Sequence, residues 1–213
     1  MNDPYLDPQA GILRNLTGAT TQRELDNDES ELVRLRMLAF PERTLWKSSY
    51  LGQLQEIHHY LFQDLYEWAG DVRTIDMTRN VDFGAYFCPA VSIDRGMSWF
   101  EDQLRTENEL RNLERERFVG RLAFYYGELN YMHPFRDGNG RTQRIFWSRF
   151  VSGSRYSLDW TATSRDENDV ASAQAMARGV DATSNGLVAM FNKVVQPAID
   201  PLPVDAYALG FPH

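Results

Sequence analysis

The stretch that decides how this chain folds is His133-Pro134-Phe135-Arg136-Asp137-Gly138-Asn139-Gly140-Arg141-Thr142-Gln143-Arg144. Glycine on both sides of Asn139 lets several backbone N–H groups face one ligand, because no side chain blocks close approach. The following residues, Arg141 to Ser152, are predicted to form a helix, so these N–H groups lie at a predicted helix N-terminus, where anions bind. The stretch therefore predicts a phosphate site.

Four side chains of the same stretch suit nucleotide chemistry. Arg141 and Arg144 are three residues apart, so they share one helical face and provide two fixed cations. Asp137 is a hard oxygen ligand suited to Mg²⁺, an ion that usually arrives with nucleotide phosphates. His133 is a candidate general base at neutral pH. Each residue taken singly has an ordinary explanation, such as a turn or a solvated helix face, but the combination indicates a nucleotide-phosphate site with a base beside it.

The stretch is similar at every defined position to the signature of the Fic (filamentation induced by cAMP) family, His-x-Phe-x-Asp/Glu-Gly-Asn-Gly-Arg-x-x-Arg. Such a match arises by chance on the order of once in 10¹⁰ starts. A looser resemblance runs from Asp3 to about Gln196. It implies a mainly α fold, a Fic-type helical bundle with one β-hairpin flap beside the active site. We expect a single Fic domain over residues 1–196, with its core at about 48–153, and an irregular tail over 197–213.

The resemblance implies transfer of AMP from ATP to a Ser, Thr or Tyr hydroxyl of another protein. His133 would take the hydroxyl proton, Asp137 would hold Mg²⁺, and Phe135 would anchor the loop in the core. Five residues would bind the ATP phosphates: Gly138, Asn139, Gly140, Arg141 and Arg144.

Residues 72–88 contain several β-formers interrupted by Asn80 and Gly84, which predicts a hairpin. In Fic proteins the matching segment is a flap that holds the target peptide as an extra strand. The resemblance assigns this contact to Thr74, Ile75, Asp76 and Met77. An ordinary surface hairpin is the alternative.

Thr21 and Glu24 have the spacing of a capping box and predict a helix through about Leu38. Its inward side chains are predicted to be Leu25, Leu32, Leu35 and Met37. Apolar spacing predicts further helices over about 48–69, 91–112, 114–131, 164–178 and 183–195. His58 and His59 lie in the first of these without further metal ligands, so we expect them to be ordinary helix residues.

Composition restricts the class of protein. The net charge of −8, from 22 Lys and Arg against 30 Asp and Glu, gives no footprint for nucleic-acid binding. The single cysteine, Cys88, excludes an internal disulfide framework and is expected to be a small buried residue. Neither a signal peptide nor a membrane span is evident, so the bacterial cytoplasm is the expected location, or a host cell if the protein is a delivered effector.

Two other functions start from the same fold. Some Fic relatives transfer phosphate or phosphocholine, but those that phosphorylate usually lack the distal arginine, and Arg144 is present here. A non-catalytic nucleotide-binding module is the other alternative. It is disfavoured because His133 has no evident structural role that Asn or Gln could not perform.

Regulation is predicted to come from outside the chain. Thr163-Ser164-Arg165-Asp166-Glu167-Asn168 fits the pattern Ser/Thr-x-x-x-Glu-Gly/Asn, whose Glu pairs with the second signature arginine in self-inhibited Fic enzymes. We interpret it instead as a helix start, with Thr163 or Ser164 as cap.

The opening residues, Asp3-Pro4-Tyr5 and Ile12-Leu13-Arg14-Asn15, resemble the branch that a separate small antitoxin inhibits. The expected partners are therefore an antitoxin that supplies a Glu to Arg144 and a target protein. A topoisomerase subunit and a small GTPase both stay open as that target of a toxin-like or effector enzyme.

Overall fold

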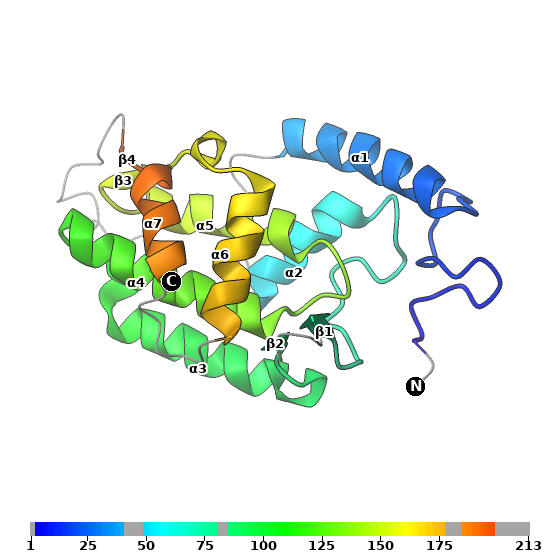
Figure 1. Cartoon of the computed structure of the whole chain (residues 1–213), viewed down its shortest axis with the longest axis horizontal. Helices are drawn as coiled ribbons and strands as arrows, with labels where there is room; N and C mark the ends of the chain where they lie inside the picture. The colour runs from blue at the N-terminus through cyan, green and yellow to red at the C-terminus, as the bar shows by residue number, and fades with distance from the viewer. Residues whose placement is uncertain (1–2, 41–48, 81–84, 178–184, 199–213) are drawn as a thin grey trace. The chain divides into compact units, whose positions relative to one another are not determined.

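The computed structural model describes residues 3–40, 49–80, 85–177 and 185–198. The chain divides into two compact units. The first unit comprises Met1–Ile75 and Pro134–Thr142, and the second comprises Asp76–His133 and Gln143–His213. The mainly α fold class is confirmed, and Figure 1 shows the helices in chain order from blue to orange. The described part of the chain has no helix that is both long and apolar enough to cross a bilayer.

Two helices form the frame of the first unit, α1 (Gln22–Leu38) and α2 (Tyr50–Phe62), which pack against each other. The capping box that begins α1 is confirmed, because the Thr21 side chain accepts from the Glu24 N–H and Glu24 reaches back to the cap. The predicted inward face is only partly right. Leu25 is buried as predicted, but Val33 takes the second inward place, and Leu35 and Met37 are exposed. The pattern of α1 alone therefore did not define its packed face.

Helix α2 ends earlier than the sequence predicted. Its last residue is Phe62, and residues 63–70 form successive turns with backbone bonds back to Phe62 and Tyr66. Gly70, at φ +91°, closes them, as a glycine at a chain reversal does. Leu65 and Trp68 are nevertheless buried, so the apolar pattern marked burial correctly while the helix boundary was wrong.

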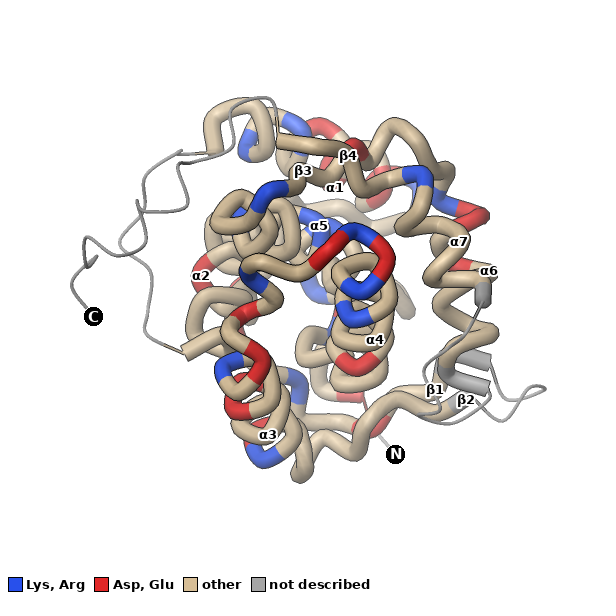
Figure 2. Tube along the Cα trace, turned by 90° about the vertical axis from the view of Figure 1, so that its left-hand side faces the viewer, with Lys and Arg blue, Asp and Glu red and all other residues tan. Residues whose placement is uncertain are grey.

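Helices dominate the second unit: α3 (Ile93–Thr106), α4 (Arg115–Met132), α6 (Arg165–Ala177) and α7 (Asn185–Val194). Helix α4 packs against α3, α6 and α7, and one of its faces is buried. Figure 2 shows that α3 carries both acidic and basic residues. Short 3-10 turns η2 (Ala90–Ser92) and η3 (Asn108–Leu110) flank α3, and Trp160–Ala162 forms another, η4. The predicted helix 91–112 is therefore shorter, because residues 108–110 take left-handed φ values.

Helix α5 (Asn139–Ser152) contains the end of the signature, and its first four residues belong to the first unit. Its remaining residues belong to the second, where Phe146, Trp147 and Val151 are buried. The predicted start at Arg141 was two residues late. The helix N-terminus therefore lies directly at the glycine-flanked Asn139.

Two small antiparallel sheets complete the second unit. The predicted hairpin is present as β1 (Thr78–Asn80) paired with β2 (Ala85–Tyr86), and its tip at 81–84 lies outside the described residues. The sequence did not predict the second sheet, β3 (Tyr156–Leu158) with β4 (Val195–Pro197). Most of the predicted irregular tail also lies outside the described residues, and its first residue, Pro197, is in β4. Cys88 is buried, as expected.

Candidate active site

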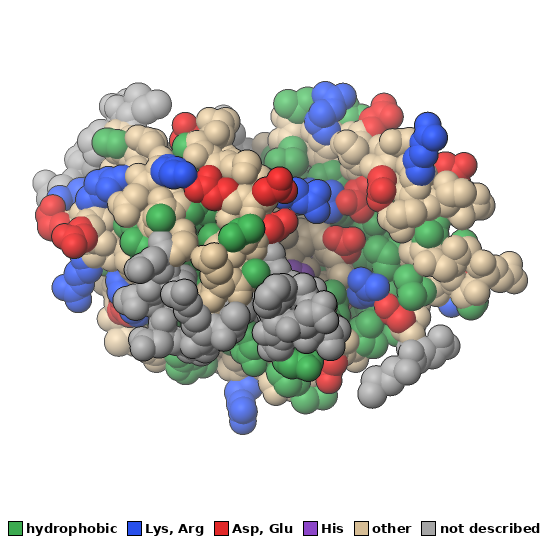
Figure 3. Space-filling view, viewed as in Figure 1, with side chains coloured by type: hydrophobic (Ala, Val, Ile, Leu, Met, Phe, Trp, Pro, Cys, Tyr) green, Lys and Arg blue, Asp and Glu red, His purple; other side chains and the backbone are tan. Residues whose placement is uncertain are grey.

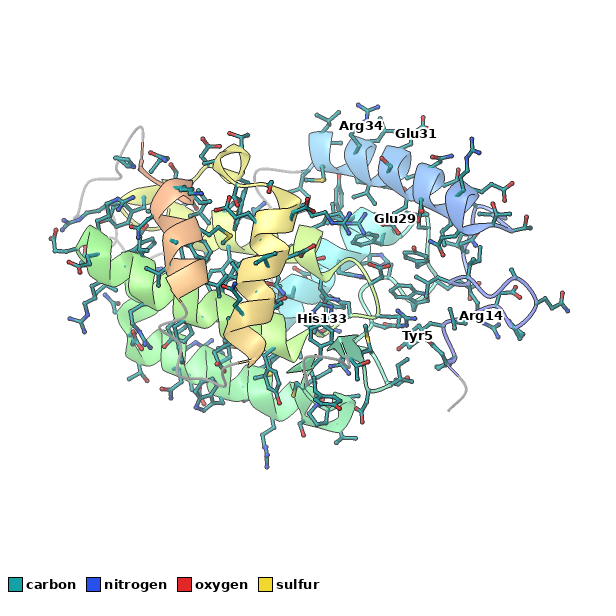
Figure 4. All side chains as sticks on the ribbon, in the orientation of Figure 1. Tyr5, Arg14, Glu29, Glu31, Arg34 and His133 are labelled. Atoms are coloured by element: carbon teal, nitrogen blue, oxygen red, sulfur yellow. The ribbon has the colours of Figure 1, made fainter. Side chains whose placement is uncertain are left out.

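His133, the predicted base, is the residue at which α4 ends. It caps α4 in a left-handed conformation (φ 43°, ψ 62°) and donates its N–H to the Leu129 carbonyl at 3.1 Å. Its ring stacks on Phe87, just after β2, with centroids 3.8 Å apart and planes 19° from parallel. The side chain is half-buried, at the end of the helix in Figure 4. A flat aromatic contact sets the ring plane and leaves the edge nitrogens as the polar groups of the ring.

Asn139 gives the loop after His133 its shape. Its Oδ1 accepts the Phe135 N–H at 2.9 Å, and its Nδ2 donates to the Phe135 carbonyl at 2.7 Å. Asn139 and Phe135 are both buried. Since both polar atoms of the side chain are used, the part of Asn139 that can meet a phosphate is its backbone N–H.

His58 is a site residue that the sequence analysis missed. Its Nδ1 accepts the Gly70 N–H at 2.8 Å, so the proton of the neutral ring lies on Nε2, which is 3.0 Å from the Asp137 carbonyl and donates to it. The ring is fully buried and stacks on Phe135 at 4.0 Å. Burial lowers the pKa of His58 to about 3, which keeps the ring neutral.

His58 lies in a helix, as expected, but its buried hydrogen bond to the signature loop was not predicted. One signal could have found it. His58 is four residues after Leu54 and four before Phe62, so it belongs to the apolar stripe of α2, where a histidine needs polar partners.

Gly138 lies where a side chain would clash. Its φ is +76°, and a Cβ there would be 2.4 Å from Cζ of Phe62. Its N–H donates to Oδ1 of Asp137 at 2.5 Å. The next three N–H groups, of residues 139–141, open α5 and have no acceptor within the helix. Of the predicted phosphate-binding N–H groups, those of Asn139 and Gly140 therefore remain available, whereas that of Gly138 is engaged.

Arg141 has carboxylate and aromatic neighbours in the first unit. Its Nη2 is 2.5 Å from Oε1 of Glu29 and 3.8 Å from Oδ1 of Asp137. Its guanidinium carbon is 4.7 Å from the centroid of the Phe62 ring. This first signature arginine is therefore held on two sides.

Arg144 has different neighbours in the second unit. Its guanidinium carbon lies 5.9 Å from the centroid of the Trp160 ring. Within the described residues no carboxylate pairs with it, and its Nε is buried without a hydrogen-bond partner. Among these residues, Arg144 is thus the signature arginine whose charge is not already neutralised.

Asp137 fits an ion that is brought by nucleotide phosphates. Its side chain is 47% exposed, and one carboxylate oxygen already accepts from Gly138. The described residues contain no group of three or more His, Cys, Asp or Glu side chains placed to bind a metal. A single accessible carboxylate suits Mg²⁺ whose other ligands are phosphate oxygens and water.

The four predicted target-binding residues precede β1 rather than lie in it. In the first unit, the Thr74 N–H donates to the Tyr5 hydroxyl at 3.1 Å, and the Ile75 carbonyl accepts from Arg73 at 2.6 Å. In the second, Oδ1 of Asp76 accepts the Ala90 N–H, and the Met77 carbonyl accepts the Phe87 N–H. Part of the backbone that would pair with a target strand is therefore already bonded.

The motif-like segment 163–168 begins α6. The Ser164 hydroxyl accepts the Glu167 N–H at 3.1 Å, as an N-cap does. The Glu167 carboxylate accepts from Lys193 at 2.6 Å and from Thr163 at 3.2 Å. Asn168 is buried and accepts from the Tyr126 hydroxyl. The interpretation as a helix start is confirmed, and in this structure Glu167 contacts Lys193 rather than Arg144.

Solved structures share this fold. BepC, a VirB-translocated Bartonella effector protein from Bartonella tribocorum with bound AMPPNP, matches with a TM-score of 0.82 at 24% identity, over 93% of this chain and 99% of that one. The N-terminal Fic domain of a putative cell filamentation protein from Bartonella quintana, with bound ADP, matches with a TM-score of 0.82 over 92% of this chain and 95% of that one, also at 24% identity. At these identities the likeness shows the fold.

Sequence comparisons go further. The chain is 34% identical over 196 residues to the probable protein adenylyltransferase Fic of Escherichia coli K12, covering 92% of this chain and 94% of that protein. It is 35% identical over 174 residues to the protein adenylyltransferase VbhT of Bartonella schoenbuchensis. That match covers 82% of this chain but only 36% of the length of VbhT. The model of the Fic/DOC family matches residues 49–151, which contain the signature. The chain therefore belongs to the Fic/DOC family.

Proposed function

We propose that this protein is an adenylyltransferase that moves AMP from ATP to a Ser, Thr or Tyr hydroxyl of a target protein. One observation carries the proposal: His133 leads directly into a loop that Asn139 and His58 hold in shape, and the loop ends at the open N-terminus of α5. The names of the Escherichia coli and Bartonella relatives and the nucleotides in the similar structures support it.

In the proposed reaction the target oxygen attacks the α-phosphorus of ATP, the bond to the bridging oxygen of pyrophosphate breaks, and pyrophosphate leaves. His133 takes the proton that the hydroxyl loses, because a neutral imidazole nitrogen is a suitable base near pH 7. The backbone N–H groups of Asn139 and Gly140 hold phosphate oxygens as charge develops on them. Arg144, with no carboxylate partner among the described residues, stabilises the leaving pyrophosphate.

We assign the metal-binding role to Asp137, whose accessible carboxylate is suited to Mg²⁺ that arrives with ATP. Mg²⁺ bound there supplies charge neutralisation on the phosphates. Phe135, buried against His58, is assigned to anchoring the loop. The target peptide is still predicted to bind to the segment of Thr74, Ile75, Asp76 and Met77. It would pair with the backbone N–H and C=O groups that are not already hydrogen-bonded.

The partners are also proposals. We propose a separate antitoxin protein that inhibits the enzyme by pairing a Glu with Arg144. The absence of any carboxylate on Arg144 among the described residues supports this, because a partner can then supply one. If the protein acts as a toxin, its target is a topoisomerase subunit in the bacterial cytoplasm. If it acts as a delivered effector, its target is a small GTPase in a host cell.

Labelled ATP tests the function. Purified protein, bacterial lysate and Mg²⁺ are incubated with ATP labelled on the α-phosphate or on the γ-phosphate. Protein-bound label from the α-position alone, lost in His133→Ala, is the expected result. Label from the γ-position alone would make the protein a kinase. Label retained by His133→Ala would remove that residue from the role of base.

A further inference from the structure

Glu29 projects from α1 toward the interior of the first unit. Figure 4 shows it on the side of α1 opposite Glu31 and Arg34. Its side chain is 17% exposed, whereas Glu31 and Arg34 are exposed. Glu29 precedes the part of the chain that the family model matches, and the sequence analysis gave it no role. A carboxylate withdrawn from water in this way needs polar partners.

Both oxygens of Glu29 have a partner. Oε1 is 2.5 Å from Nη2 of Arg141, and Oε2 accepts from the Tyr66 hydroxyl at 2.6 Å. Tyr66 is buried, and burial together with the adjacent carboxylate raises its pKa well above the usual value, so the phenol stays protonated and donates. The buried phenol therefore fixes the rotamer in which Glu29 meets Arg141.

The contact leaves most of the guanidinium available. An arginine has five N–H donors, and the short contact with Glu29 is made by Nη2. The Phe62 ring supports the guanidinium from one side at 4.7 Å. A cation held by a carboxylate and an aromatic ring has already lost its rotamer freedom, so a phosphate that binds it does not have to order it.

We propose that Glu29, oriented by Tyr66, is a positioning residue that holds Arg141 ready for the phosphates of the nucleotide. The proposal rests on the proposed function, because the positioning of Arg141 matters only if the protein binds a nucleotide phosphate. In this proposal Glu29 contacts Arg141 and not the nucleotide. Its effect passes through Arg141, and this dependence is what an experiment can isolate.

The test is the affinity of each variant for a non-hydrolysable ATP analogue with Mg²⁺, measured by calorimetry. We expect Glu29→Ala to weaken binding about 10-fold, the effect of losing one charge-assisted hydrogen bond. Glu29→Gln, which can still accept from Tyr66, should lie between Glu29→Ala and the wild type. Tyr66→Phe should weaken binding about 3-fold, because the carboxylate stays but loses its orientation.

Two matched controls separate positioning from damage to α1. Glu31→Ala removes a carboxylate two residues away on the same helix. Arg36→Ala breaks a different ion pair of α1, in which Nε of Arg36 lies 2.7 Å from Oδ2 of Asp64. Both should bind the analogue within 2-fold of the wild type, and the KM for ATP should follow the same order as the affinities while kcat changes little.

The double variant decides the mechanism. In the Arg141→Ala background, Glu29→Ala should have no further effect, because its target is gone. A full effect of Glu29→Ala in that background, or a Glu29→Ala protein that binds the analogue as well as or better than the wild type, would overturn the proposal. Failure of the wild type to bind the analogue at all would instead overturn the proposed function.

Discussion

The middle and the two ends of the signature have different surroundings. In the middle, polar bonds fix nearly every group: His58 donates to Asp137, Asn139 clasps the Phe135 backbone, and Glu29 holds Arg141. At each end, the signature residue lies against an aromatic ring: Phe87 lies flat on His133, and Trp160 lies beside Arg144. Hydrogen bonds fix both the direction and the distance of a contact, while a stacked ring mainly fixes the plane of its neighbour. The loop between the two ends is therefore held mainly by hydrogen bonds and ion pairs, whereas each end residue packs against an aromatic ring.

The largest expected effect concerns Arg144, at one end of the signature. Arg144→Ala should reduce AMP transfer at least about 100-fold, since one donor to developing charge contributes that much. Stability should change little, because Arg144 has no ion pair among the described residues to lose. Initial rates with α-labelled ATP give the measurement. Arg165→Ala, at a side chain that is 88% exposed in the same unit, is the control. Transfer within 3-fold of the wild type would contradict the assignment.

The next effect tests the fixed middle. Asn139→Ala removes both bonds to Phe135 and leaves buried backbone groups unpaired, which should cost about 2 kcal/mol of the free energy of unfolding and lower Tm by roughly 4–8 °C. Calorimetry measures this. Gly140→Ala is the control, because a Cβ there meets nothing within 4 Å and alanine favours a helix. An unchanged Tm in Asn139→Ala would show that the loop is not held in this way.

A smaller effect concerns Glu128, a buried carboxyl group of the second unit. Unlike Glu29 in the first unit, it lacks polar partners among the described residues. Glu128 is buried in α4, burial raises its pKa, and its side chain makes no hydrogen bond or ion pair with the described residues. The Glu128 carboxyl group therefore binds its proton more tightly in the folded state than in the unfolded state. Stability from Glu128 is fully present below the unfolded pKa of about 4.5 and is lost as pH rises through the folded value.

Glu128→Gln should remove this loss. The variant should match the wild type near pH 4 and exceed it at pH 8, by about 2–4 °C in Tm if the difference reaches about 1 kcal/mol. Thermal unfolding over pH 4–8 gives the comparison. A gain that is larger at pH 4 than at pH 8 would have the wrong sign and would contradict burial as the cause.

The last substitution, at Glu167, is expected to have no effect on activity. Glu167→Gly should leave AMP transfer within 2-fold of the wild type, because Glu167 contacts Lys193 and Thr163 rather than Arg144. Glu167→Ala separates loss of the carboxylate from the backbone effect of glycine. A large rise in activity in both variants would show that the segment inhibits the enzyme after all, and that the end of the signature is less free than the structure indicates.

The parts of the fold that local chemistry decides were predictable. Thr21 and Glu24 cap a helix through contacts three residues apart, and the glycines at 138 and 140 mark the turn into α5. The parts that depend on distant partners were not. His58 gains its meaning from Asp137, 79 positions away, and Glu29 from an arginine on another helix. The β3–β4 pair, of three residues a strand, is likewise fixed by partners about 40 positions away. The turn and helix that carry the signature could thus be predicted from the sequence, while the distant residues that support them could not.

The left-handed backbone of His133 carries a thermodynamic consequence. A residue with a Cβ is held there at a cost on the order of 1–2 kcal/mol, whereas glycine adopts such φ values freely and is common just after a helix. His133→Gly should therefore be inactive and yet more resistant to heat than His133→Ala. At the position that we propose for the base, the chain thus gives up conformational stability in order to hold an imidazole, and the proposal implies that its most stable version is not a functional one.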